Sequence, residues 1–279
     1  MVLGMLMLLL ACTRPERVPS DADTSAPADS DAPTPIEPGC GGEDACEIAD
    51  GKYLAWAPSD ADGPLPVLIF VHGYGGVPLS ISNDTEEVAA MNDLGVLLIL
   101  PASDGNSWNE DRGSDRRDDY AFIESVIDDA ETRWGLDPDR VFVGGFSTGG
   151  SMASMLACYL PERFAGAVTM SGTFWEPMPT DCAAPIPLQH THGTTDTTWP
   201  LEGRSFGSAA QGAVADGVAV WRTLNGCSEE STITKDGPLL CEEWSGCEAP
   251  TRLCMHDYAH QRVDGWGARQ AGWLLSVSE

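Results

Sequence analysis

The stretch RVFVGGFSTGGSMA, residues 140–153, carries a serine between two pairs of glycines. Val141 to Phe146 is rich in strand-forming residues, and Gly150 to Leu160 can form a helix. A strand-turn-helix of this kind displays a serine oxygen beside a helix N-terminus, which supplies positive potential. The flanking glycines let strand and helix approach without Cβ clashes. Ser147 is therefore a candidate nucleophile, while a phosphate loop is excluded because no lysine stands near it.

Further apolar runs surround this turn in the sequence. Buried strands are expected at residues 66–71, 96–100, 165–170 and 186–190. Between them, Asp118 to Trp134 carries one apolar stripe, with Asp118 or Asp119 able to cap its start and Gly135 following its end. Alternating strands and helices predict a three-layer α/β fold with a mainly parallel central sheet. Sites in such sheets lie at the carboxyl ends of the strands.

A second glycine-rich turn, HGYGG at residues 72–76, follows the first predicted buried strand. Such a loop can contribute a backbone N-H to an oxyanion hole. We expect the N-H groups of Tyr74 and Thr148 to be these donors. Preorganised donors are usually the largest electrostatic contribution to catalysis, each being worth about 2.7 to 4 kcal/mol.

Five blocks together carry a family resemblance: HGYGG at 72–76, DDYAFIESVIDD at 118–129, RVFVGGFSTGGSMA at 140–153, FAGAVTMSGT at 164–173 and THGTTDTTWP at 191–200. They are similar to the α/β-hydrolase branch that contains polyhydroxybutyrate depolymerases, feruloyl esterases and acetylxylan esterases. The resemblance extends from about Lys52 to the C-terminus. It implies the α/β-hydrolase fold, and it implies that Asp196, in the family's HGxxD motif, is the acid of a Ser-His-Asp triad.

The base of the triad is expected after this aspartate, because hydrolases of this kind run Ser, then Asp, then His along the chain. His72, His190 and His192 precede Asp196 and are better suited to structural or supporting roles. His256 and His260 remain. We prefer His260, since residues 251–255 form a predicted strand and His260 falls in the loop beyond it; His256 stays the alternative. The family's histidine is usually followed closely by Trp-Pro, whereas here Trp266 is more distant and lacks the proline.

The N-terminal residues predict export. Residues 1–11 are apolar but too short to span a membrane, which indicates a signal peptide. The sequence LLAC at residues 9–12 resembles a bacterial lipobox and implies lipidation of Cys12. Residues 12–39 are rich in Pro, Asp and Ser, which predicts a flexible tether, and residues 40–279 form the predicted catalytic domain.

Eight further cysteines suit an oxidising compartment. Cys40 with Cys46 and Cys158 with Cys182 are plausible pairs. For Cys227, Cys241, Cys247 and Cys254, disulfides that brace the histidine loop are favoured over zinc, since the spacings lack a CxxC pair. No metal or cofactor motif is present. Three tryptophans that follow predicted strands are candidates to line an acyl pocket, although core packing explains each equally well: Trp108, Trp175 and Trp199.

The chain of 279 residues has a formal net charge of −28, of which residues 13–38 contribute only two arginines against six acidic residues. Such a charge argues against nucleic acid and anionic membranes as partners, leaving lipid on Cys12 as the route to a membrane. It favours solubility and predicts a preference for neutral over anionic esters.

The sequence thus predicts a secreted serine esterase that acts through an acyl-enzyme. A peptidase of the same fold and a non-catalytic surface-binding lipoprotein are the alternatives. The acyl group, the alcohol and the oligomeric state stay open.

Overall fold

The fold is built on one large sheet, seen in a computed structural model that describes residues 39–60 and 63–278. The strand order is β1-β2-β4-β3-β5-β6-β7-β12-β11-β10. Pairing is parallel from β4 through β12 and antiparallel at both margins. The mainly parallel sheet is as predicted, and the antiparallel margins are an addition that the sequence did not reveal.

The strands of this sheet are β1 (Cys46–Ile48), β2 (Gly51–Trp56), β3 (Leu65–Val71), β4 (Leu97–Pro101), β5 (Leu136–Phe146), β6 (Gly166–Met170), β7 (Leu188–Gly193), β10 (Ser231–Asp236), β11 (Leu239–Trp244) and β12 (Thr251–His256). A separate hairpin consists of β8 (Arg204–Phe206) and β9 (Ala209–Gln211). The helices are α1 (Leu79–Ser82), α2 (Thr85–Asp93), α3 (Asp119–Trp134), α4 (Thr148–Tyr159), α5 (Val214–Leu224) and α6 (Trp266–Val277), with a 3-10 turn at Pro161–Arg163.

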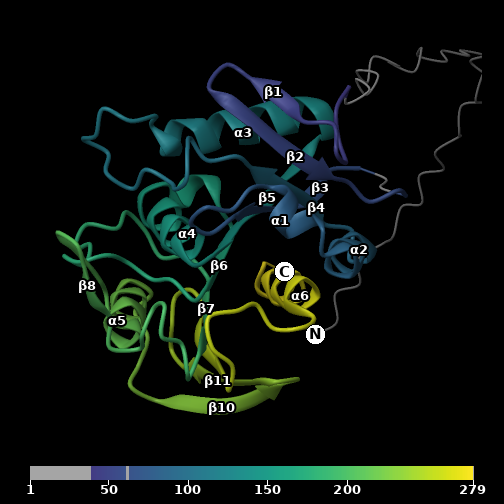
Figure 1. Ribbon diagram of the computed structural model, residues 1–279. Coiled ribbons are helices and arrows are strands. Elements are labelled where there is room, and N and C mark those ends of the chain that lie inside the picture. Colours follow the sequence, from purple (N-terminus) through teal and green to yellow (C-terminus); the bar gives the residue numbers. More distant parts are fainter. Residues whose placement is uncertain (1–38, 61–62, 279) are drawn as a thin grey trace, which may run out of the picture. The chain divides into compact units, whose positions relative to one another are not determined.

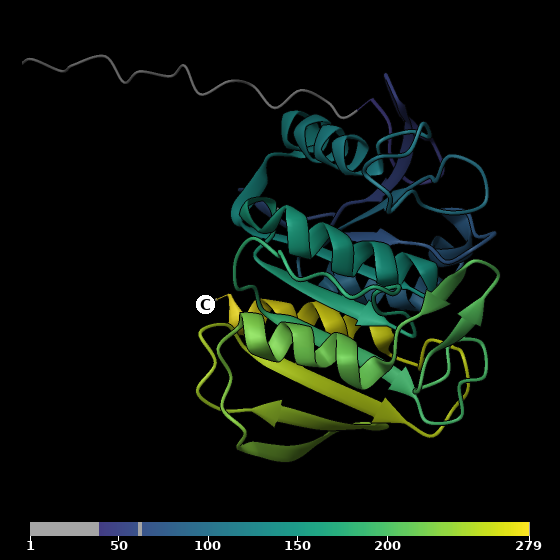
Figure 2. The same ribbon diagram turned by 90° about the vertical axis from the view of Figure 1, so that its left-hand side faces the viewer.

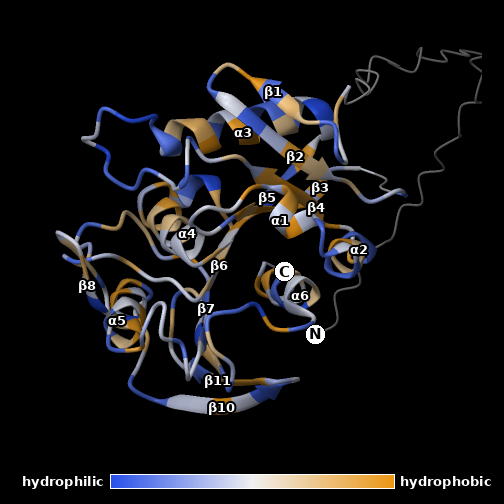
Figure 3. Ribbon diagram, in the orientation of Figure 1, coloured by the Kyte–Doolittle hydropathy of each residue, from blue (hydrophilic) through white to orange (hydrophobic). Residues whose placement is uncertain are grey.

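Helices cover both faces of the sheet, as Figures 1 and 2 show. Side chains alternate along a strand, so Val67 and Ile69 of β3 pack in one core with α3, α4 and α5, whereas Leu68 and Phe70 pack in the other with α1, α2 and α6. Strands β3 and β4 are accordingly buried along their whole length, and the ribbon around their labels is mostly orange in Figure 3. This arrangement confirms the three-layer α/β prediction.

Helix α3 begins and ends where its sequence predicts. The Asp118 side chain accepts hydrogen bonds from the backbone N-H groups of Tyr120 and Ala121, at 3.0 and 3.2 Å. Gly135 ends the helix with a φ of 68°, which glycine adopts without steric cost. Asp118 is therefore the cap, and Asp119 instead pairs with Arg117 inside the protein.

All eight cysteines of the described residues form disulfides: Cys40–Cys46, Cys158–Cys182, Cys227–Cys247 and Cys241–Cys254. This confirms the two suggested pairs and excludes zinc binding by the other four cysteines. Four disulfides fit an oxidising, extracellular environment.

The predicted signal peptide, the lipidation site Cys12 and all but the last residue of the tether lie outside the described residues. Across the part of the chain that is described, helices are too short or too polar to cross a bilayer.

Candidate active site

Ser147 lies at a sharp turn between β5 and α4. Its backbone has a φ of 59°, a conformation that is uncommon outside glycine and that typically accompanies a functional constraint. The turn is possible because its neighbours lack a Cβ: a Cβ on Gly145 would lie 2.1 Å from the carbonyl oxygen of Gly149, and one on Gly149 would lie 2.0 Å from that of Val71. The GxSxG glycines thus allow β5, α4 and β3 to meet at the serine.

Three side chains from distant parts of the sequence meet at this turn. His260 Nε2 lies 2.8 Å from Ser147 Oγ, and His260 Nδ1 lies 2.7 Å from Asp196 Oδ2. A carboxylate only accepts hydrogen bonds, so Nδ1 carries the ring proton and Nε2 is free to accept the serine proton. Ser147, Asp196 and His260 follow β5, β7 and β12, whose carboxyl ends share one edge of the sheet.

Asp196 is held from several sides. Its Oδ1 accepts backbone N-H bonds from Thr198 and Trp199, both at 2.8 Å, while Oδ2 accepts from His260. His192 Nε2 lies 3.4 Å from Oδ2. The Asp196 side chain is fully buried, so its charge is poorly screened and its orientation is fixed.

His190 and His192 form a directional hydrogen-bond chain behind this carboxylate. His192 Nε2 donates to the carbonyl of Trp199 at 2.8 Å, so its Nδ1 accepts from His190 Nε2 at 3.0 Å. His190 Nδ1 then accepts from the hydroxyl of Thr169 at 2.8 Å. Burial lowers the pKa of both histidines, and the pKa of His190 falls well below its usual value. Both imidazoles are therefore neutral, and His192, which lies beside Asp196, helps to hold the carboxylate in place.

The remaining two histidines are occupied elsewhere. His256, the alternative base, is buried, and its Nδ1 accepts from the backbone N-H of Tyr258 at 3.2 Å. His72 packs its ring against Trp108, and its Nδ1 lies 2.9 Å from the carbonyl oxygen of Gly73. Among the described residues, neither forms a hydrogen bond with Ser147, so His260 is the histidine that the structure places against the serine.

Backbone N-H groups near Ser147 are available as donors. Thr148 is the first residue of α4, where N-H groups lack helical partners, and Tyr74 lies in the loop after β3. Within the described residues, neither N-H has a hydrogen-bond acceptor, whereas the next one, that of Gly75, donates to Asn106. The Tyr74 side chain is 70% exposed, so any role of this residue close to the serine belongs to its backbone.

A cavity of about 650 Å³ opens beside Thr148. Trp108 and Trp175, two of the three candidate tryptophans, line it. Trp199 does not; it is 1% exposed, packs edge-on against Trp175 at 5.2 Å and donates its indole N-H to the carbonyl of Gly212. Trp199 is therefore an interior packing residue and does not line this cavity.

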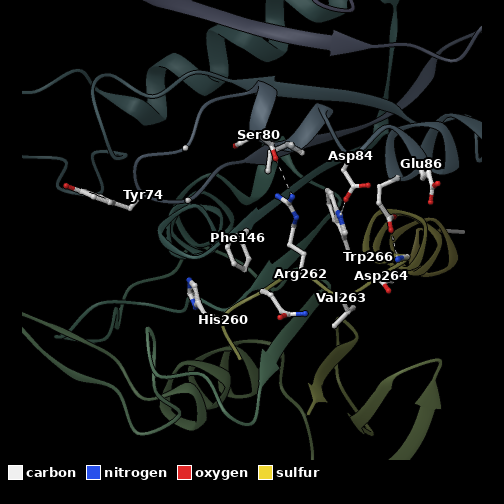
Figure 4. A pocket seen from close by; sticks show the side chains of 16 residues that line it. Tyr74, Ser80, Asp84, Glu86, Phe146, His260, Arg262, Val263, Asp264 and Trp266 are labelled. Atoms are coloured by element: carbon white, nitrogen blue, oxygen red, sulfur yellow. Dashed lines mark hydrogen bonds between the residues drawn. The ribbon is translucent and has the colours of Figure 1, made fainter. Parts of the chain in front are cut away.

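A second cavity, of about 680 Å³, is lined by Gly73, Phe146 and His260, among other residues. Figure 4 shows Tyr74 and His260 toward one end and the acidic Asp84, Glu86 and Asp264 toward the other. The Arg262 side chain extends between them toward Ser80, and its guanidinium lies over the rings of Phe146 and Trp266, 5.9 and 5.1 Å from their centroids. Burial lowers the pKa of Arg262.

One polar residue of the first cavity escaped the sequence reasoning. Glu110 accepts a hydrogen bond from the hydroxyl of Ser151, on α4, at 2.8 Å, and the Trp175 side chain also bonds to it. Burial raises the pKa of Glu110 to about 8. A glutamate in a polar loop carries no local signal of burial, so only its proximity in sequence to Trp108 could have drawn attention to it.

No group of three or more potential metal ligands occurs among residues 39–60 and 63–278.

Comparison with known proteins agrees with this geometry. Residues 106–217 match the family described as Phospholipase/Carboxylesterase. Relatives include NocK of Nocardia uniformis subsp. tsuyamanensis, which is named as an esterase (30% identity, 53% of this chain, 45% of NocK), and feruloyl esterase B of Piromyces equi (24% identity, 76% and 42%). The chain spans less than half the length of either relative.

Among solved structures, acetyl xylan esterase from Aspergillus awamori superposes with a TM-score of 0.61 at 16% identity, over 81% of this chain and 96% of that enzyme. At such low identity the likeness establishes the fold. The chain therefore has the α/β-hydrolase fold, and it is similar to esterases of that fold.

Proposed function

We propose that this protein is a serine esterase that hydrolyses uncharged carboxylic esters through an acyl-enzyme. The observation that carries the proposal is the position of His260, which bridges Ser147 and Asp196 at 2.8 and 2.7 Å. Esterase relatives and the strained serine turn add support.

In the first half of the reaction, Ser147 Oγ attacks the carbonyl carbon of the ester while His260 Nε2 accepts the hydroxyl proton. The carbonyl oxygen becomes negative and is stabilised by the N-H groups of Tyr74 and Thr148. The bond to the alcohol oxygen then breaks, and His260 returns the proton to the alcohol. Asp196 holds the Nδ1-H tautomer and stabilises the imidazolium.

In the second half, water takes the place of the alcohol. His260 accepts a proton from the water as its oxygen attacks the acyl carbon, and it then protonates Ser147 Oγ as the carboxylic acid leaves. Nucleophile and base are thus restored.

Each of the two cavities would hold one part of the ester substrate. The leaving oxygen must lie within hydrogen-bond reach of His260 Nε2, so the alcohol belongs in the cavity that His260 lines and the acyl group belongs in the cavity beside Thr148. Three of the acidic residues around the alcohol cavity, Asp84, Glu86 and Asp264, outnumber Arg262. Together with the net charge of −28, this favours neutral esters.

Substitution Ser147→Ala tests the proposal. The variant should lose turnover of a short p-nitrophenyl ester and should not be labelled by a fluorophosphonate probe, whereas the wild type should show both. Full activity of the variant would exclude Ser147 as the nucleophile. Assaying an amide beside the matching ester separates an esterase from a peptidase.

We also propose that the protein is exported and anchored by lipid on Cys12, which the four disulfides and the LLAC sequence support. In a bacterial expression host, substitution Cys12→Ser should move the protein from the membrane fraction to the soluble fraction. An unchanged distribution would argue against the anchor.

A further inference from the structure

The acyl cavity is lined by Glu110, which forms a polar pair with the fully buried Ser151, and the hydrogen bonds of this pair are incomplete. Glu110 and Ser151 meet at 2.8 Å, and the Trp175 side chain also bonds to the carboxyl. While Glu110 carries a proton, its carboxyl group and the Ser151 hydroxyl each have one O-H. Only one hydrogen bond joins the two groups, so it uses only one of these two O-H donors. Within the described residues, no further acceptor is bonded to either group. One O-H is therefore left for a group inside the cavity.

The position of this O-H relates it to the nucleophile. Ser147 is the N-cap of α4, and the backbone N-H of Ser151 donates to the carbonyl of Ser147 at 3.1 Å, so the two residues lie about one helical turn, roughly 5.4 Å, apart along the axis. Trp108 and Trp175 line the same cavity and provide apolar walls. An acyl chain that leaves the serine into this cavity passes tryptophan rings and meets a hydrogen-bond donor.

We propose that Glu110, together with Ser151, is a specificity-determining residue that binds an acceptor oxygen, such as an ether or hydroxyl, on an uncharged acyl group. The inference rests on the proposed esterase function and names a substrate feature for it. An acyl group with a methylene at that place leaves the O-H without a partner other than water, and an acyl carboxylate is excluded by Glu110 once it ionises.

Other charges near Glu110 bear on its protonation. Asp111, Arg116 and Glu176 also line the cavity. Arg112 lies over the rings of Tyr120 and Tyr159, 5.5 and 5.1 Å from their centroids, and Glu110 itself raises the pKa of Tyr120. Within the described residues, neither Arg112 nor Arg116 forms an ion pair with Glu110, so burial is the main influence and raises the pKa of the carboxyl to about 8.

The test compares two matched pairs of p-nitrophenyl esters: 3-methoxypropanoate with pentanoate, and 4-methoxybutanoate with hexanoate. Each pair differs by one oxygen in place of a methylene. The ratio of kcat/KM within a pair is measured for the wild type and for Glu110→Leu, after subtraction of spontaneous hydrolysis. Because intrinsic ester reactivity cancels between enzymes, we expect the ratio to fall about ten-fold in the variant for at least one pair, as for loss of one hydrogen bond.

Two further variants separate this role from a structural one. Glu110→Gln retains a donor and should keep most of the preference at every pH, whereas the preference of the wild type should decline between pH 6 and pH 9 as Glu110 loses its proton. Glu176→Gln removes an exposed carboxylate from the same cavity and should leave the ratio within about two-fold of the wild-type ratio.

Failure of the two proposals can be told apart. A wild type that cleaves none of the four esters would contradict the esterase function. A wild type that cleaves them, with ratios unchanged in Glu110→Leu for both pairs, would overturn the role of Glu110 and leave the esterase standing.

Discussion

Substitution Asp196→Asn should disable the proposed base without disturbing the fold. Oδ1 of Asp196 accepts two backbone N-H bonds, from Thr198 and Trp199. An asparagine must present its oxygen to these donors, because an NH2 group there would leave both buried N-H groups unpaired at a cost of about 1–3 kcal/mol each. The NH2 group then faces His260 Nδ1, which has to become an acceptor. The ring proton moves to Nε2, where it blocks acceptance of the proton from Ser147.

The magnitude follows from the lost tautomer and the lost carboxylate charge. The same exchange in a serine protease triad lowers kcat by about 10⁴-fold, equivalent to about 5.4 kcal/mol. We expect a similar loss here in kcat for p-nitrophenyl butyrate, with little change in KM, because Asp196 is buried behind His260 and does not line the cavities. Melting temperatures should stay close, since the side chains have equal size.

Asp257→Asn is the matched control. Asp257 is an exposed carboxylate close enough to affect the charge of His256, but it forms no hydrogen bond with His260. This control should keep kcat within about two-fold of the wild type. The tautomer reasoning is wrong if Asp196→Asn keeps more than about a tenth of the wild-type kcat, or if Asp257→Asn loses as much.

Three predictions concern stability. Gly149→Ala places a Cβ 2.0 Å from a backbone oxygen and should lower the free energy of unfolding by about 1–3 kcal/mol or more. Its control is Gly272→Ala, within α6 and with open space around it, which should raise the free energy of unfolding by about 0.5–1 kcal/mol. Both are measured by urea unfolding, and equal losses in the two variants would contradict the steric argument. Removing the Cys241–Cys254 bond with a double alanine variant should cost about 3 kcal/mol in the same assay, and no change would refute a bracing role. Glu110 holds its proton to about pH 8 when folded but only to about pH 4.5 when unfolded, so its contribution to stability should fall as pH rises between these values; a Glu110→Gln variant with the same pH slope would exclude this.

Much of the fold was predictable because its signals are local. The β3 run from Leu65 to Val71 is buried at every residue, so an apolar run suffices to identify it. Helix α3 carries its own cap in Asp118 and its own end in Gly135. The margins of the sheet were not predictable in this way. Strand β10 is largely exposed and is held by its antiparallel backbone pairing with β11. Because no face of it is buried, its sequence has no apolar pattern that would reveal a strand.

The candidate active-site residues also differ in whether a local sequence signal identifies them. Ser147 could be predicted since the serine, its glycines and the flanking strand and helix are consecutive, and the backbone at φ 59° follows from that local pattern. For Asp196, its motif after the strand and its chain order were enough for a prediction.

The choice between His256 and His260 belongs to the tertiary structure. Both follow the serine and the aspartate, and only four residues separate them. Pairing of β12 with β7 places His256 opposite Gly193, where it ends the strand, while the loop beyond carries His260 back to Ser147, 113 residues away in sequence. Burial of Glu110 likewise depends on α4 and Trp175, which lie far from it along the chain. A sequence specifies residue types and local periodicity directly, but which distant side chains share a cavity is settled only when the strands pair in register.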